Sequence, residues 1–402
     1  MRIMLIADGR SPITRNWIEM LDPGEHEVLL VSTYPYDEIN GLYAQTMIPV
    51  GFSRLAGGQV KGAAQSGKTI LRKLISIFRP LFMRMRAFLT PMMLRRPQIR
   101  LLEYVLKHQP DIVHALRIPF EGMLGSALFN GVPFVLSIWG NDLSMHAGTS
   151  WMMKYRTRQA LLHADGLMAD AASDIQIAKE IGVREHIPDL VVPGSGGLDL
   201  TELNPKTGTQ ILDKYGLQAN VPLVINPRGF RPGSVHQDTF FNAIPVVIEK
   251  IPEAIFVCPG MDGQPEAHNW VTRLGIEKNT ILLPFLPQSE LWALYRHTAV
   301  YVSLSSHDGT PNSFLEAIAR GCFPVVGRIP SLCEWVEDGV NGYLVHPEDS
   351  AGAAGAIINA LENDAIRDKA AGKNAELIRA RADRRVARVQ VLNFYQGLLK
   401  EN

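Results

Sequence analysis

The sequence has little cysteine: three residues among 402, Cys258, Cys322 and Cys333. An odd number of cysteines, spaced in no metal-binding pattern, excludes a disulfide framework and predicts a reducing compartment. The chain also has no run of about 18 uncharged apolar residues, which excludes a membrane-spanning helix. Its first apolar run is short and is followed by Asp8 and Gly9, so it predicts a strand and not a signal peptide. These absences predict a cytoplasmic protein.

Metal-binding patterns are absent as well. The sequence contains no Asp-x-Asp motif and no group of His or Cys residues at ligand spacing. We therefore expect a reaction that needs no divalent metal ion.

Acidic residues are almost missing from one segment. Residues 52–107 contain twelve Lys or Arg and a single acid, Glu103, which gives a net charge of +11. Because the whole chain has a net charge of zero, the remainder carries −11. A segment this basic is typical of a surface that faces an anionic polymer or an anionic membrane.

Within that segment, residues 68–89 have the pattern of an amphipathic helix. At helical spacing the apolar side chains fall in an arc of about 140°, and the basic ones fall outside it. Pro80 must kink or divide such a helix. The stripe could lie in the interface of an anionic membrane. The alternative is a helical pair that packs its apolar side on the domain core and exposes its basic face.

The stretch GAAQSGKT, residues 62–69, matches the P-loop pattern G-x-x-x-x-G-K-[ST]. A P-loop needs a buried strand directly before it and a helix directly after it. Residues 55–61 contain two glycines and no apolar run, so the strand is missing. We therefore assign Lys68 to the start of the basic helix. A peripheral membrane ATPase that uses Lys68 is a distant alternative.

Apolar strand patterns alternate with helical patterns in two series, and a chain of 402 residues is too long for one core. The alternation predicts an α/β fold with two doubly wound parallel sheets and ligands at the carboxyl ends of the strands. The end of the chain, 365–399, is expected to form one long helix. The expected strands are 2–8, 26–32, 111–116, 133–139, 166–170 and 189–194 in the first series, and 222–228, 254–260, 280–286, 300–306 and 323–328 in the second.

The most informative segment runs from the strand at 300–306 into a helix that begins near Pro311. Thr310 is the expected N-cap, with Pro311 at the first helical position. The free N–H groups and the positive dipole end of such a helix suit a phosphate. Asp308 and Glu316 would repel a phosphate placed on them, so we expect them to accept hydrogen bonds from sugar and ribose hydroxyls.

This segment resembles the signature of glycosyltransferase family 4, whose members are retaining enzymes with the GT-B fold. In that signature an acid is followed, after seven residues, by Glu; here these are Asp308 and Glu316. GCFPVV, Glu334 and the pair Asn341-Gly342 follow in the family's order. Further landmarks that match in order are PDIVHA (110–115), GVPFVLSIWGNDL (131–143), GGLDLTELNP (196–205) and LPQSELWALYRHTAVYVSLSS (286–306).

The resemblance implies two Rossmann-like domains that face a central cleft. Residues 1–205 would form the acceptor-binding domain, with the basic segment 52–107 as its least similar part. Residues 206–380 would bind the donor, a nucleotide sugar. Residues 381–402 would form a helix that crosses back to the first domain.

The resemblance also implies roles for donor-site residues. Glu316 would hold the ribose hydroxyls, and Asp308 stands where the family has a Glu that contacts the donor sugar. Arg228 would clamp the donor diphosphate. The family's Lys about eight residues later corresponds to His236, with Arg231 as the alternative second cation. The remaining expected donor-binding residues surround the helix start: Gly309, Thr310, Pro311 and Asn312.

In the first domain the match is weaker. Trp139 occupies the position of a family histidine, so that residue's role near the reacting carbon is not carried over. Asp142 is left as a polar candidate for the catalytic set, beside Asp308, Arg228 and His236, and a structural loop cap is its alternative role. The turn DGRSP takes the place of the family's acceptor loop, in which Gly9, Arg10 and Ser11 are the expected acceptor-binding residues.

By resemblance, the chain is expected to be a retaining hexosyltransferase that uses a UDP- or GDP-linked sugar and no separate cofactor. Its acceptor would be lipid-linked or a polysaccharide. The expected location is the inner face of the cell membrane, reached through 68–89, and no nucleic acid partner is expected. The alternatives on the same fold are a nucleotide-sugar epimerase and a transferase with a soluble acceptor.

Overall fold

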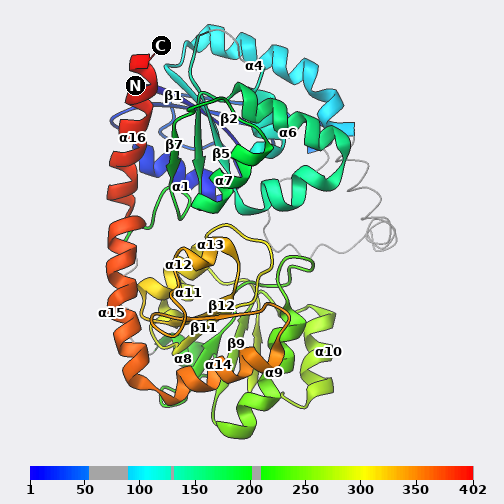
Figure 1. The fold of residues 1–402 in the computed structure, drawn as a ribbon, viewed down its shortest axis with the longest axis vertical. Helices are drawn as coiled ribbons and strands as arrows, with labels where there is room; N and C mark the ends of the chain where they lie inside the picture. The colour runs from blue at the N-terminus through cyan, green and yellow to red at the C-terminus, as the bar shows by residue number, and fades with distance from the viewer. Residues whose placement is uncertain (54–88, 128–130, 202–209, 402) are drawn as a thin grey trace. The chain divides into compact units, whose positions relative to one another are not determined.

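The computed structural model describes residues 1–53, 89–127, 131–201 and 210–401. The P-loop-like stretch 62–69 and the amphipathic stripe 68–89, apart from its last residue, lie outside the described residues. The chain divides into two units (Figure 1). The first unit contains Met1–Gly196 and Arg388–Asn402, and the second contains Gly197–Ala387.

The first unit contains a seven-stranded parallel sheet of order β3-β2-β1-β4-β5-β6-β7. The six strands expected from the apolar runs are confirmed, and β3 adds an edge strand. The strands are β1 (Arg2–Ala7), β2 (Glu27–Ser32), β3 (Ala44–Met47), β4 (Ile112–Ala115), β5 (Phe134–Ile138), β6 (Gly166–Ala169) and β7 (Asp189–Val191). The helices are α1 (Pro12–Leu21), η2 (Thr90–Leu94), α4 (Arg95–His108), η3 (Ile118–Gly122), α5 (Met123–Gly125), η4 (Asp142–His146), η5 (Ala147–Thr149), α6 (Trp151–His163) and α7 (Ala172–Ile181).

Helices bury both faces of this sheet, as the continuous apolar runs of its strands require. On one face, side chains of α4, α5, α6 and α7 form the main core with alternate strand residues. On the other face, α1 packs Trp17 edge-on against His114 of β4, with ring centroids 5.0 Å apart. The C-terminal helix lies beside α1 (Figure 1). It covers the same face, because Tyr395 hydrogen-bonds to His114 Nδ1 at 2.6 Å.

His114 is therefore a satisfied core residue. Its Nε2 lies 2.7 Å from Ser137 Oγ, and the ring is fully buried. Burial lowers the pKa of His114 to about 3, so the ring is neutral and ties β4 to β5 and to the C-terminal helix.

The second unit contains a six-stranded parallel sheet of order β10-β9-β8-β11-β12-β13. The five expected strands are confirmed, and β13 adds an edge. The strands are β8 (Leu223–Ile225), β9 (Ile255–Pro259), β10 (Thr280–Leu283), β11 (Val300–Ser303), β12 (Phe323–Gly327) and β13 (Tyr343–Val345). The helices are α8 (Gln210–Lys214), α9 (Gln237–Lys250), α10 (Pro265–Leu274), α11 (Gln288–Tyr295), α12 (Asn312–Ala319), α13 (Pro330–Cys333), α14 (Ser350–Glu362) and α15 (Asp364–Arg381).

Successive strand residues of this sheet enter different cores, which is the period-two pattern of a doubly covered sheet. Val224 packs with α9, α10 and α14, whereas Ile225 packs with α8, α11, α12 and α13. The two units are thus each doubly wound, as the alternating sequence pattern predicts.

The end of the chain differs from the single long helix that we expected. It forms two helices, α15 and α16 (Arg384–Glu401), which are separated by Ala382 and Asp383. The Asp383 carboxylate accepts a hydrogen bond from the backbone N–H of Arg385 at 2.8 Å, so it caps the start of α16. An Asp favours such a cap over a helix interior, which explains the break. The last helix begins in the second unit and continues in the first.

Candidate functional site

Each sheet has one point at which the chain reverses its direction of winding. In the first unit this switch point lies between β1 and β4, and in the second it lies between β8 and β11. Loops diverge at such a point, so open α/β sheets bind ligands outside the carboxyl ends of the strands there. The site residues expected from the sequence follow these four strands or their neighbours.

In the second unit, a buried polar pair holds the loop after β8. Asn226 donates a hydrogen bond from Nδ2 to Gln237 Oε1 at 2.7 Å, and Gln237 Nε2 donates to the carbonyl of Gly229 at 2.7 Å. Gly229 has a φ of +61°, a conformation that favours glycine. The pair anchors the loop to the start of α9 and fixes the backbone on both sides of Arg228.

The same loop is joined to the segment that follows β11. Val235 and Ser305 form an antiparallel bridge, and the backbone N–H of Ser306 donates to Ser234 at 3.0 Å. The N–H of His236 donates to the carbonyl of Leu304 at 2.8 Å. These bonds bring the loop of Arg228, Arg231 and His236 beside the segment of Asp308, as the shared switch point predicts.

Arg228 is the centre of this cluster. Its guanidinium forms an ion pair with Asp308, and Nη1 donates to Ser313 Oγ at 3.4 Å. Ser313 Oγ also lies 3.2 Å from the hydroxyl of Tyr301 on β11. The Arg228 side chain is only 8% exposed, and its buried Nε has no hydrogen-bond partner among the described residues. A buried charged donor without an acceptor is costly, so this N–H is ready to bind an anionic oxygen.

Arg231 supplies a second positive charge near Arg228. Desolvation of its guanidinium and the like charge of Arg228 lower the pKa of Arg231 below its ordinary value. None of the ion pairs among the described residues involves Arg231. With Arg228 matched by Asp308, Arg231 leaves this cluster with a positive excess. His236 caps α9 only through its backbone, without a side-chain capping bond.

The helix that follows Asp308 begins one residue later than we expected. α12 starts at Asn312, and the N-cap is Pro311, with a ψ of 131° and no side-chain capping bond. Thr310 is therefore not the cap: its Oγ1 accepts a hydrogen bond from Trp335 Nε1 at 3.3 Å. The helix starts later because Pro311 itself has an extended backbone and so stands at the cap position instead of the first helical position. Gly309 and Thr310 are buried in the turn between Asp308 and the helix.

Glu316 lies on α12 and is 4% exposed. Its Oε1 accepts a hydrogen bond from Gln288 Nε2 of α11 at 2.7 Å. Burial raises the pKa of Glu316 to about 7. Hydroxyl donors from a ligand would stabilise the ionised form of this carboxylate.

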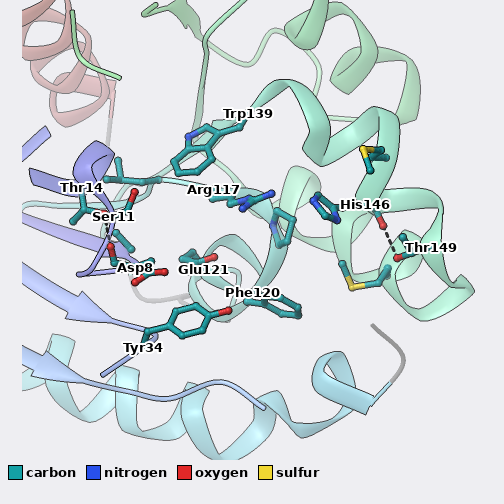
Figure 2. A pocket seen from close by; sticks show the side chains of 15 residues that line it. Asp8, Ser11, Thr14, Tyr34, Arg117, Phe120, Glu121, Trp139, His146 and Thr149 are labelled. Carbon is teal, nitrogen blue, oxygen red and sulfur yellow. Dashed lines mark hydrogen bonds between the residues drawn. The ribbon is translucent and has the colours of Figure 1, made fainter. Parts of the chain in front are cut away.

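In the first unit, a cavity of about 570 Å³ opens at the switch point (Figure 2). It is bordered by residues at the carboxyl ends of β1, β2, β4 and β5 and by α1, η3, η4, η5 and α6. The lining is mostly apolar. The lining residues are Ala7, Asp8, Ser11, Thr14, Tyr34, Leu116, Arg117, Pro119, Phe120, Glu121, Trp139, Met145, His146, Thr149 and Met153.

Of the expected acceptor residues, Ser11 lines this cavity and caps α1 by accepting a hydrogen bond from the N–H of Ile13. Arg10 and Gly9 are not among the lining residues. The Arg10 guanidinium pairs with Asp8 at 2.8 Å and stacks over the Tyr34 ring. A Cβ at Gly9 would lie 2.6 Å from the ring of Tyr36, so this glycine allows a close approach within the protein.

Asp142 is fully buried and does not line the cavity. Its carboxylate pairs with Arg117 Nε at 2.8 Å and accepts hydrogen bonds from the N–H groups of Ile118 and Trp139 at 3.1 and 3.3 Å. This placement favours the structural alternative, in which Asp142 caps the loop. The guanidinium that it holds lines the cavity and stacks over Trp139, 5.0 Å from the ring centroid.

Sequence reasoning missed several residues of both switch points. Arg117 follows β4 closely and Glu121 lies in η3, and both are in the cavity wall, yet neither belongs to a recognised motif. Asn226 and Gln237 flank the expected Arg228 loop. Polar residues immediately after a buried strand are the signal that could have found Arg117 and Asn226.

Residues 212–377 match the family model of glycosyl transferases group 1. This group 1 match spans the Arg228 loop, Asp308 and α12. No curated protein sequence matches the chain significantly.

Solved structures resemble the whole chain. HepE from Anabaena, in complex with UDP and glucose, has a TM-score of 0.74 at 16% identity, over 99% of this chain and 100% of that one. Sucrose-phosphate synthase from Thermosynechococcus elongatus has a TM-score of 0.73 at 14% identity, over 100% of both chains. WaaG, a glycosyltransferase involved in lipopolysaccharide biosynthesis, has a TM-score of 0.66 at 12% identity, over 98% of this chain and 100% of that one. Such identities show the fold alone: two Rossmann-like units of the GT-B type.

Membrane-spanning helices and metal sites were sought among the described residues. None of their helices is both long and apolar enough to cross a membrane. Nor do they gather three or more His, Cys, Asp or Glu side chains into a site for a metal ion.

Proposed function

We propose that this protein is a retaining glycosyltransferase that moves a hexose from a nucleotide-diphosphate sugar to a lipid-linked or polysaccharide acceptor. The observation that carries the proposal is the cluster around Arg228, with its buried unpartnered N–H, inside the region of the group 1 match. The UDP bound in the HepE structure supports a nucleotide sugar as the donor. UDP- and GDP-linked sugars are the two donor classes to test.

The donor would lie at the switch point of the second unit. Arg228 and Arg231 would bind the diphosphate, His236 would lie beside it, and the start of α12 would add its positive dipole end. Glu316 would accept hydrogen bonds from the ribose hydroxyls, and Asp308 from the donor sugar. Gly309, Thr310, Pro311 and Asn312 would form the wall next to the phosphates.

Transfer breaks the bond between the anomeric carbon and the diphosphate oxygen and forms a bond from that carbon to the acceptor oxygen. Negative charge grows on the leaving diphosphate, so fixed cations lower the barrier. In the retaining route that we propose, the acceptor attacks from the face on which the diphosphate leaves. The acceptor proton then passes to a leaving phosphate oxygen, which explains why no separate base is required.

A thermal-shift panel tests the donor class, because a ligand that binds only the folded state raises the melting temperature. We expect UDP or GDP, and one of their sugar conjugates, to stabilise the protein in the presence of a chelator. Stabilisation that requires manganese would contradict the metal-independent route. A panel in which no nucleotide diphosphate shifts the melting temperature would contradict the function as a whole.

We also propose that the first unit contacts an anionic membrane from the cytoplasmic side. The described part of the basic segment supports this: Met92 and Met93 are more than half exposed, next to the exposed Arg95 and Arg96. Exposed apolar side chains beside basic ones suit a lipid interface. Flotation with anionic vesicles should carry the protein upward and neutral vesicles should not. Equal recovery with both kinds of vesicle would contradict this location.

A further inference from the structure

Among the described residues, the two arginines at the cavity of the first unit are each paired with a carboxylate. Arg10 pairs with Asp8 and Arg117 pairs with Asp142, each at 2.8 Å. Each guanidinium is thus matched by its own carboxylate, and Glu121 adds a further acid to the lining. An anionic ligand such as a sugar phosphate would meet no unpaired Arg or Lys of the described residues there. The charges therefore favour a neutral ligand.

The remaining lining suits a ring with apolar faces and polar edges. In Figure 2, Glu121 and Arg117 lie between Trp139 on one side and Tyr34 and Phe120 on the other. A sugar ring can pack its C–H faces on such aromatic surfaces while its hydroxyls bind the polar groups between them. A volume of about 570 Å³ falls in the range of small-molecule sites.

Glu121 is a hydrogen-bond acceptor that lies between the aromatic residues of this lining (Figure 2). The residue is 4% exposed, and its Oε1 accepts a hydrogen bond from Thr33 Oγ1 at 2.6 Å. The preceding residue, Phe120, has a φ of +71° and a ψ of −55°, which is strained for a side chain of this size. The strained turn brings both Phe120 and Glu121 into the cavity wall. Strain of this kind persists where the surrounding structure holds a site in place.

We propose that this cavity binds an uncharged sugar ring of the acceptor and that Glu121 accepts a hydrogen bond from one of its hydroxyls. The assignment of this sugar to the glycosyl acceptor rests on the proposed transferase function. The binding of a neutral sugar in the cavity does not depend on that function.

Binding should depend on pH. Burial raises the pKa of Glu121 to about 7, Arg117 acts against this rise, and Asp8 adds to it. Tyr34 and His146 are the other titratable groups of the lining. Because a hydroxyl donor binds the ionised carboxylate more strongly, sugar affinity should increase as the pH rises from 5 to 8.

The experiment measures binding to the full-length protein by saturation-transfer NMR and calorimetry. The probes are methyl glycosides of the common hexoses, 6-deoxyhexoses and N-acetylhexosamines, each beside its 6-phosphate where one exists. We expect at least one neutral glycoside to bind at least tenfold more tightly than its phosphate. Glu121→Gln should weaken that binding about tenfold at pH 8 and little at pH 5, because a hydrogen bond to a charged group is lost only where the group is charged. Glu185→Gln, at an exposed glutamate of the same unit, should change nothing.

Trp139→Leu is a second variant, at a half-buried position, and should weaken the same glycoside at both pH values. The proposal is overturned if no neutral glycoside binds, if phosphates bind more tightly, or if Glu121→Gln leaves affinity and its pH dependence unchanged. UDP is measured in parallel. UDP binding without glycoside binding overturns this inference alone, whereas glycoside binding without any nucleotide binding overturns the proposed function.

Discussion

The two switch points share one geometry and differ in charge. In the second unit, Arg228 and Arg231 face one neighbouring carboxylate, Asp308, and Arg228 keeps a buried N–H without a partner. In the first unit, each guanidinium beside the cavity is matched by its own carboxylate, and the walls are mostly apolar. The same strand order can therefore build a site for an anion or a site for a neutral ligand. The residues that follow the strands decide which.

The largest effect is expected from Arg228→Ala. Removing this guanidinium takes away the buried donor to the diphosphate, so UDP affinity should fall about 100-fold and turnover by at least as much. Isothermal titration with UDP measures the first and a transfer assay the second. Arg328→Ala is the matched control, because Arg328 pairs with Asp338 on an exposed surface of the same unit. Wild-type UDP affinity in Arg228→Ala would remove the contrast between the two switch points.

Glu316→Gln should have the next largest effect, because it removes the charge that the ribose hydroxyls bind. We expect UDP affinity to fall about tenfold. Pyrophosphate, which has no ribose, should bind Glu316→Gln and the wild type equally. An equal loss for both ligands would show that Glu316 acts through the helix and not through the ribose.

Asp308→Asn tests the same difference in charge with a change that should strengthen anion binding instead of weakening it. The substitution removes the negative charge that pairs with Arg228, so pyrophosphate affinity should rise about threefold, a modest gain because Asp308 is partly exposed. Transfer should become slower if Asp308 binds the donor sugar. Calorimetry that shows weaker pyrophosphate binding would contradict an anion site at Arg228.

The smallest effect is on stability and concerns the first unit. Burial raises the pKa of Glu121 to about 7, so the folded state holds a proton that the unfolded state has already lost. The free energy of unfolding therefore decreases as the pH rises from about 4.5 to 7, by roughly 2 kcal/mol. Gln cannot ionise, so Glu121→Gln should gain stability over the wild type between pH 5 and pH 8 in urea denaturation. Parallel curves for the two proteins would contradict a buried, protonated Glu121.

Features that depend on local sequence pattern, above all the strands, could be predicted from the sequence. Parallel strands buried on both faces are continuous apolar runs, so eleven of the strands could be placed before the structure. The pattern does not reveal β3, whose residues AQTM form no continuous apolar run and are not buried, or β13, whose run YLV is only three residues long. The sequence pattern does not reveal the break between α15 and α16, because the Asp383 cap interrupts no apolar period.

The candidate site was less predictable because its contacts join distant segments. Arg228 and Asp308 are each recognisable from resemblance, but their pairing depends on two loops that meet only in the folded sheet. Arg117 and Glu121 carry no motif, and their importance follows from a cavity that forms only when four strand ends converge. Asp142 is polar and close to a strand end, yet its carboxylate is fully buried and binds groups of the protein instead of lining the cavity.

The most direct test of the charge comparison is a crystal structure of the protein soaked with a UDP- or GDP-linked sugar. We expect the diphosphate within hydrogen-bond distance of Arg228 Nε and the ribose hydroxyls on Glu316. Density for the diphosphate in the Glu121 cavity, or at any place away from Arg228, would contradict the account.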